Sequence, residues 1–251
     1  MKLIIDNLAA DYTSVGKGPV VLVLHGWGDS SQSFQALGQL LAPKYRVILV
    51  DLPGFGATDI PQKAWTIEDY AKFVVKFCNK LSIQPEIIIG HSMGGRIAIK
   101  LVGEKLLSPQ KLILLATAGI KQSDSVRNKT YKAAAKTGKF ITNLPGLKKY
   151  QKSLRQKLYK SAGTTDYLQA GPMQETFVNV INEDLQATAK NILVPTLLVY
   201  GTDDAETPPE YGKVFHDIIK GSELMIIPDT GHFVQLDAID QVANKIEEFI
   251  K

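Results

Sequence analysis

The fold is decided by one short stretch, Ile87-Ile88-Ile89-Gly90-His91-Ser92-Met93-Gly94-Gly95-Arg96-Ile97-Ala98. An apolar run rich in β-branched residues meets a Gly-x-Ser-x-Gly pentapeptide, and an amphipathic run over residues 96–104 follows. This order predicts a buried parallel strand, a very tight turn and a helix. Because Gly90 and Gly94 lack a Cβ, the strand and the helix can approach closely. We therefore expect Ser92 to be strained and to point out of the carboxyl edge of the sheet.

The same turn favours nucleophilic chemistry at Ser92. The first N–H groups of a helix have no partner within the helix, so they can stabilise negative charge that develops beside the serine. The alternative is a glycine-rich turn in which the serine only caps the helix. The position of the pentapeptide between a strand and a helix favours the nucleophile of an acyl-transfer enzyme.

Strands and helices alternate along most of the chain. Strands are predicted over residues 20–24, 45–50, 87–89, 111–116, 196–200 and 223–227, and helices over residues 33–41, 66–81, 96–104, 209–219 and 236–250. Thr66, with Asp69 three residues later, is the predicted N-cap of the second helix. This alternation predicts an α/β protein with a mostly parallel, doubly wound sheet.

The alternation stops between residues 120 and 190, where apolar positions recur at helical spacing. We therefore predict a core domain of residues 1–119 and 191–251 that carries an inserted helical lid of residues 120–190. Within this lid, residues 121–160 hold twelve basic residues and one acidic residue, Asp124, so that the segment carries +11. Because the whole chain carries +4, the remainder carries −7.

The composition excludes several classes of protein. The 251 residues suit one domain or one domain with an insertion, and no apolar run approaches the roughly eighteen residues of a membrane span. The N-terminal apolar run is too short for a signal peptide, so a cytoplasmic location is expected. The single cysteine, Cys78, excludes an intrachain disulfide and is expected to be a buried, inert thiol. No Cys/His cluster has the spacing of a metal site.

The charge of the lid has two interpretations. A solvated surface is one, and weak attraction of anionic substrates or of an anionic lipid surface is the other. Binding of nucleic acid is not expected, because no recognition motif accompanies the charge.

Polar groups follow several strands of the predicted sheet, at the edge where ligands of such sheets bind. A serine hydroxyl needs a base, and that base needs an orienting acid. His232 follows the last strand and is the predicted base. His91 is expected to point away from Ser92, His25 to shape its own loop, and His216 lies within a helical run.

The loop of residues 201–208 offers three carboxylates for the acid. Asp204 is the predicted acid and Asp203 is the alternative. The loop after the preceding strand holds no carboxylate, and the chain order Ser, Asp, His matches one of the known triad orders.

The oxyanion that forms on attack needs waiting donors. The backbone N–H of Met93 is one candidate, and that of Trp27 is the other, since Gly26 and Gly28 let this loop approach closely.

Together these motifs resemble the α/β-hydrolase superfamily, in particular serine hydrolases of the esterase, lipase and proline-iminopeptidase type. The likeness covers residues 20–251 except the insert, and it rests on His25-Gly26-Trp27-Gly28, Asp51-Leu52-Pro53-Gly54-Phe55-Gly56, Gly90-His91-Ser92-Met93-Gly94-Gly95, Gly201 with Asp204 and Pro208, and Gly231-His232. The resemblance implies the α/β-hydrolase fold, favours Asp204 over Asp203, and implies neither a metal nor an organic cofactor. The short N-terminus departs from it, because it leaves little room for the first two of the usual eight strands.

The sequence thus predicts a serine hydrolase that cleaves small-molecule carboxylic esters, with short-chain or small aromatic acyl groups, through an acyl-enzyme. A lactonase, a thioesterase, an aminopeptidase or a carbon–carbon bond hydrolase would use the same triad. A ligand receptor on a hydrolase scaffold is the alternative outside enzymes. The sequence specifies neither the physiological substrate nor the oligomeric state.

Overall fold

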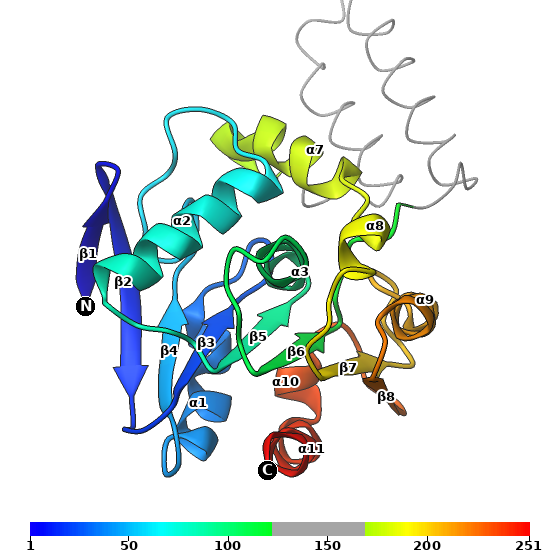
Figure 1. The fold of residues 1–251 in the computed structure, drawn as a ribbon. Helices are drawn as coiled ribbons and strands as arrows, with labels where there is room; N and C mark the ends of the chain where they lie inside the picture. The colour runs from blue at the N-terminus through cyan, green and yellow to red at the C-terminus, as the bar shows by residue number, and fades with distance from the viewer. Residues whose placement is uncertain (122–168) are drawn as a thin grey trace, which may run out of the picture.

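The apolar runs of the sequence form an eight-stranded sheet in the computed structural model, which describes residues 1–121 and 169–251 (Figure 1). The strand order is β1-β2-β4-β3-β5-β6-β7-β8. The pairs β1/β2 and β2/β4 are antiparallel, and all other neighbours are parallel. The prediction of an α/β protein with a mostly parallel sheet is confirmed.

The six predicted strands lie close to where their sequence patterns place them, and two further strands come before them in the chain. Their bounds are β1 (Lys2–Ile5), β2 (Leu8–Val15), β3 (Val20–Leu24), β4 (Arg46–Val50), β5 (Ile87–His91), β6 (Lys111–Leu115), β7 (Thr196–Gly201) and β8 (Ser222–Ile227). The carboxyl ends of β3 to β8 therefore share one edge of the sheet.

The expectation that the short N-terminus leaves little room for two further strands is wrong. The strands β1 and β2 form a hairpin whose connection is Asp6 and Asn7 alone, with φ of 46° and 67°. A two-residue hairpin turn needs such left-handed backbone, which Asp and Asn adopt more readily than other residues with a Cβ. Because the turn is this short, the first fifteen residues supply both strands, and β2 pairs with β4.

Helices cover both faces of the sheet (Figure 1). One face carries α2 (Ile67–Lys80), α3 (Met93–Gly103) and α9 (Pro209–Ile218), and the other carries α1 (Gln35–Leu41) and α11 (Ile239–Ile250). The short helices are η1 (Ser31–Phe34), η3 (Gly171–Met173), α7 (Gln174–Asn182), α8 (Gln186–Ala189) and α10 (Val234–Asp237). None of the helices within the described ranges is long and apolar enough to cross a membrane.

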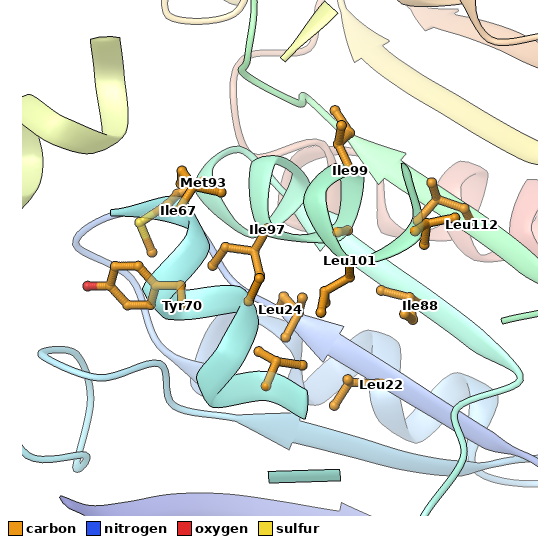
Figure 2. Packing of buried hydrophobic residues seen from close by; sticks show 14 of the residues in the cluster. Leu22, Leu24, Ile67, Tyr70, Ile88, Met93, Ile97, Ile99, Leu101 and Leu112 are labelled. Atoms are coloured by element: carbon orange, nitrogen blue, oxygen red, sulfur yellow. The ribbon is translucent and has the colours of Figure 1, made fainter. Parts of the chain in front are cut away.

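Successive residues of the central strands enter different cores. Leu24 and Ile88 belong to the core beneath α2 and α3, whereas Val23 and Ile89 belong to the core beneath α1 and α11. Figure 2 shows Ile97 of α3 pointing toward the sheet in the first of these cores. Burial on both faces explains why these strands read as continuous apolar runs.

The helix α2 begins where its cap residues predict. Thr66 Oγ1 accepts a hydrogen bond from Asp69 N at 3.3 Å, and Asp69 Oδ2 accepts one from Thr66 N at 2.9 Å. This reciprocal pair is a capping box. Cys78 of the same helix is buried, as predicted, and burial raises the pKa of its thiol to about 12.

The described end of the predicted insert is helical and is attached to the core. Thr176 Oγ1 of α7 accepts a hydrogen bond from Trp65 N at 3.0 Å, and Asn179 Nδ2 donates one to Trp65 O at 3.3 Å. Arg96 Nη1 of α3 donates to Glu183 O at 2.8 Å. Most of the predicted lid, including nearly all of its basic segment, lies outside the described residues, so the lid and the domain bounds stay predictions.

Two glycines in helices offer opposite tests of this packing. A Cβ on Gly94 of α3 would lie 2.0 Å from Leu24 O, whereas a Cβ on Gly38 of α1 would lie 3.4 Å from its nearest neighbour, Leu49 Cδ1. We expect Gly94→Ala to lower the free energy of unfolding by at least about 2 kcal/mol, because backbone must move. Gly38→Ala should keep or raise it by up to about 1 kcal/mol, since alanine favours helix.

Urea denaturation at pH 7 measures both changes. Equal stability of the Gly94→Ala variant and the wild type would contradict the close packing of α3 on β3.

Candidate active site

Ser92 occupies the tight turn between β5 and α3. Its φ of 50° and ψ of −109° lie in a region that L-residues rarely adopt, so the expected strain is present. A Cβ on Gly90 would lie 2.6 Å from Gly94 O, and a Cβ on Gly94 would lie 2.0 Å from Leu24 O. The two glycines therefore let β5, α3 and the end of β3 meet around the serine.

The helix α3 starts at Met93, three residues before the predicted start at Arg96. Its first intrahelical hydrogen bond runs from Arg96 N to Ser92 O at 3.2 Å. The N–H of Met93 precedes this bond, so it belongs to the free first turn of the helix. This position suits the predicted role of an oxyanion donor.

The loop after β3 lies against the serine. A Cβ on Gly26 would come within 3.3 Å of Ser92 Cβ, which places the backbone of Gly26 beside the turn. His25 holds this loop, because its Nδ1 donates to Gly26 O at 2.8 Å and its Nε2 accepts from Leu52 N at 2.9 Å. Burial lowers the pKa of His25, which agrees with this neutral form. Trp27 follows directly, so the loop that carries its N–H is brought to Ser92.

Asp204 lies in the loop after β7 and its side chain is fully buried. Its Oδ1 accepts hydrogen bonds from Glu206 N at 2.8 Å and Thr207 N at 2.9 Å. Its Oδ2 accepts from His232 Nδ1 at 2.8 Å and from Thr207 Oγ1 at 2.7 Å. Burial alone would raise the pKa of this carboxyl, but the hydrogen bonds from His232 and Thr207 outweigh it and lower the pKa. Asp204 is therefore an ionised carboxylate whose two oxygens are both hydrogen-bonded within the protein.

The alternative acid, Asp203, has a different environment. It is exposed, and its Oδ1 accepts from Thr202 Oγ1 at 2.9 Å. The geometry thus places Asp204, and not Asp203, on His232.

His232 lies in the loop after β8, with 9% of its side chain exposed. Because the Asp204 carboxylate can only accept, His232 Nδ1 carries the hydrogen of their bond. Its Nε2 then bears the lone pair that can accept a proton, and this nitrogen lies 3.4 Å from Glu206 Oε2 on the opposite side of the ring. This is the tautomer that a general base for a serine requires.

Two residues of this site have roles that the sequence analysis did not assign. Thr207 Oγ1 lies 2.7 Å from Asp204 Oδ2, 2.9 Å from Ala116 O and 3.1 Å from His232 Nδ1. The Asp-x-x-Thr spacing of Asp204 and Thr207 favours a turn in which the aspartate side chain accepts hydrogen bonds from the following residues. The contact of Thr207 with Asp204 could therefore have been predicted from the sequence.

His91 is the second. Its ring packs against His232 at 4.8 Å between centroids, and its Nε2 donates to His232 O at 2.9 Å. Burial, followed by the proximity of His232, lowers the pKa of His91 to about 3, so this ring is neutral. His91 therefore holds the backbone of His232, which no local sequence pattern predicts.

A pocket of about 170 Å³ lies beside Trp27, and it is lined by Trp27, Gly28, Gly54, Phe55, Gln169, Ala170 and Met173. The ring of Trp27 packs between Phe55, at 4.9 Å, and Phe177 of α7, at 5.0 Å. A cavity of about 150 Å³ is large enough for benzene. The pocket therefore suits a small acyl or aromatic group. Within residues 1–121 and 169–251, no group of three His, Cys, Asp or Glu side chains is placed to hold a metal ion.

Comparisons with known proteins agree with this architecture. Residues 19–239 match the family model described as the alpha/beta hydrolase fold. The chain is 29% identical to a pimeloyl-[acyl-carrier protein] methyl ester esterase from Nitrosospira multiformis, over 95% of this chain and 97% of that protein. It is 27% identical to a 2-hydroxy-6-oxo-6-(2'-aminophenyl)hexa-2,4-dienoic acid hydrolase from Metapseudomonas resinovorans, over 95% of this chain and 86% of that one.

Among solved structures, the enol-lactonase from Burkholderia xenovorans superposes with a TM-score of 0.78 at 19% identity. The superposition covers 100% of this chain and 99% of that one. At this identity the likeness shows a shared fold.

The buried neutral state of His91 makes stability depend on pH. Below pH about 6.5 the unfolded chain binds a proton at this histidine, whereas the folded chain does so only near pH 3. The free energy of unfolding should therefore fall as the pH is lowered through this window, by up to about 1.4 kcal/mol per pH unit from His91. His91→Gln keeps an N–H donor and should reduce this slope.

The measurement is urea denaturation between pH 4.5 and 7, which avoids the range where Asp204 becomes protonated. His216→Gln is the matched control, because it makes the same substitution at an exposed histidine. An identical slope in the His91→Gln variant and the wild type would show that His91 is not held neutral.

Proposed function

The chain belongs to the alpha/beta hydrolase family, and on that premise we propose that it is a serine hydrolase that cleaves carboxylic esters. The observation that supports this most directly is the bond of 2.8 Å between His232 Nδ1 and the buried carboxylate of Asp204. This pair lies at the same sheet edge as the strained turn of Ser92. Acyl transfer by a serine requires an imidazole that a carboxylate orients and that takes the proton of the serine hydroxyl.

The reaction divides into two halves. Ser92 Oγ attacks the ester carbonyl while His232 Nε2 takes its proton, and Asp204 stabilises the imidazolium that forms. The N–H groups of Met93 and Trp27 hold the negative oxygen of the tetrahedral intermediate. His232 then gives the proton to the leaving alcohol, and an acyl-enzyme remains on Ser92.

Water completes the cycle. His232 Nε2 takes a proton from water, the hydroxide attacks the acyl carbonyl, and the carboxylic acid leaves as the proton returns to Ser92 Oγ. No metal ion enters these steps, since the backbone donors and the imidazole supply the charge stabilisation and the proton transfer.

The pocket beside Trp27 supports short-chain or small aromatic acyl groups. Its volume of about 170 Å³ fits a group of the size of benzene. Met173 closes one side, since a Cβ on the facing Gly54 would lie 2.0 Å from Met173 Sδ.

Two of the similar proteins are named for other reactions, a dienoic acid hydrolase and an enol-lactonase. A lactonase, a thioesterase and a carbon–carbon bond hydrolase would use the same three side chains, and a receptor would keep the pocket without turnover. A panel of nitrophenyl esters, lactones, thioesters and vinylogous diketones discriminates among these reactions. The predicted lid and the attraction of anionic substrates or lipid by its basic segment remain predictions from the sequence, as does the cytoplasmic location.

Removal of the nucleophile tests the proposal. We expect Ser92→Ala to keep the wild-type fold by circular dichroism and to lower kcat for a small ester by a factor on the order of 10⁵ to 10⁶, as removal of a triad serine does elsewhere. Asp204→Asn should lower kcat by about 10⁴, because it stabilises the wrong tautomer.

Ser108→Ala is the control, because Ser108 is exposed and precedes the amino end of β6, at the sheet edge opposite to the site. A fluorophosphonate probe should add mass to the wild type and to this control but not to Ser92→Ala. Wild-type turnover by the Ser92→Ala variant would refute the nucleophile.

Shortening Met173 tests the acyl pocket. We expect Met173→Ala to raise kcat/KM for hexanoate esters relative to acetate esters by about fivefold, since the side chain vacates space for about two further methylene groups. The measurement is the ratio of the two kcat/KM values in each protein. Val178→Ala is a matched control, because Val178 is exposed on α7 and does not line the pocket. An unchanged ratio in Met173→Ala would mean that acyl groups bind elsewhere.

A further inference from the structure

A second carboxylate contacts the imidazole of His232. Glu206 Oε2 lies 3.4 Å from His232 Nε2, on the side of the ring opposite to Asp204. The Glu206 side chain is 60% exposed, whereas that of Asp204 is fully buried. The contact is longer than the roughly 2.7–2.9 Å of a tight charge-assisted hydrogen bond. The Glu206 carboxylate is therefore a largely exposed group that contacts His232 without a tight hydrogen bond.

The backbone of Glu206 is fixed even though its side chain reaches solvent. Its N–H donates to Asp204 Oδ1 at 2.8 Å, so the turn that orients the acid of the triad also fixes the position of Glu206. Among the described residues, His232 is the only one with a basic nitrogen within 4 Å of the Glu206 carboxylate. No described lysine or arginine neutralises this carboxylate.

The place of Glu206 matters because of what Nε2 does. During acylation this nitrogen gives its proton to the oxygen of the leaving alcohol, which must then lie within about 3 Å of it. A carboxylate 3.4 Å from the same nitrogen lies within a few ångström of the carbon atoms attached to that oxygen. The Glu206 carboxylate would therefore interact electrostatically with any charge that the alcohol part of the ester carries close to its oxygen.

We propose that Glu206 determines specificity for the alcohol part of the ester: its carboxylate favours substrates with a positively charged alcohol part and disfavours those with an anionic one. The inference rests on the ester hydrolysis proposed above. Within residues 1–121 and 169–251, the other charges around His232 do not reverse this preference. Asp204 is occupied by its four hydrogen bonds, His91 is neutral, and Asp237 is turned toward Gly231 N at 3.3 Å.

The test compares three acetate esters that differ in charge. Acetylcholine is cationic, dimethylbutyl acetate is its uncharged carbon isostere, and the acetate ester of hydroxybutyrate is anionic. The wild type should show the order cationic, neutral, anionic in kcat/KM. In Glu206→Gln, kcat/KM for acetylcholine relative to the neutral isostere should fall by about fivefold, as expected for partly screened charges about 4–6 Å apart. The relative value for the anionic ester should rise.

Glu210→Gln is the matched control, since Glu210 is an exposed carboxylate four positions further on that pairs with Lys213. It removes the same charge from the same part of the chain and should leave both ratios at their wild-type values. Glu206→Asp keeps the charge and should keep the sign of the preference. One molar salt should weaken the wild-type preference, because exposed charges are screened.

The outcomes separate the two proposals. If the wild type hydrolyses these esters but Glu206→Gln leaves the ratios unchanged, or if both glutamine variants change them equally, the role of Glu206 is overturned and ester hydrolysis stands. If the wild type hydrolyses none of the three, and Ser92 accepts no fluorophosphonate, the proposed function fails and the inference fails with it.

Discussion

The site depends on a carboxylate that is buried at the edge of the sheet without a counter-ion of fixed charge. Asp204 can remain ionised there because two backbone N–H groups, one hydroxyl and one imidazole N–H all donate to its two oxygens. A buried carboxylate with fewer donors would take up a proton. It would then no longer orient His232, and an imidazole in the other tautomer could not accept a proton from a serine.

The geometry around Ser92 follows from the close approach of three backbone segments. The turn at Ser92, the loop at Gly26 and the end of β3 meet in a space that admits no further Cβ. The strain at Ser92 is the local result of this packing, and the surrounding cores, which cover both faces of the sheet, stabilise it. The packing of the two hydrophobic cores thus stabilises the unfavourable backbone conformation of Ser92, the proposed nucleophile.

Much of this arrangement could be predicted from the sequence, and the reasons are specific. Parallel strands that are buried on both faces appear in the sequence as continuous apolar runs. Glycine and polar residues follow these runs and mark the carboxyl ends of the strands. The positions of Ser92, Asp204 and His232 at one edge of the sheet could therefore be inferred. The N-terminal hairpin was missed because β1 has only four residues, because β2 is mostly half-buried and lacks a continuous apolar run, and because their turn uses Asp6-Asn7 rather than a glycine. The contacts of His91 and Glu206 with His232 join residues 141 and 26 positions apart, for which the sequence alone holds no periodic pattern.

The attachment of α7 has a practical consequence for anyone who studies this protein in solution. The chain has two tryptophans. The indole of Trp27 packs on Phe177 of α7, and the backbone of Trp65 bonds to Thr176 and Asn179 of the same helix. The intrinsic fluorescence of the protein is therefore a built-in optical reporter of how this helix sits on the core, and ligand-induced displacement could be followed without any attached dye.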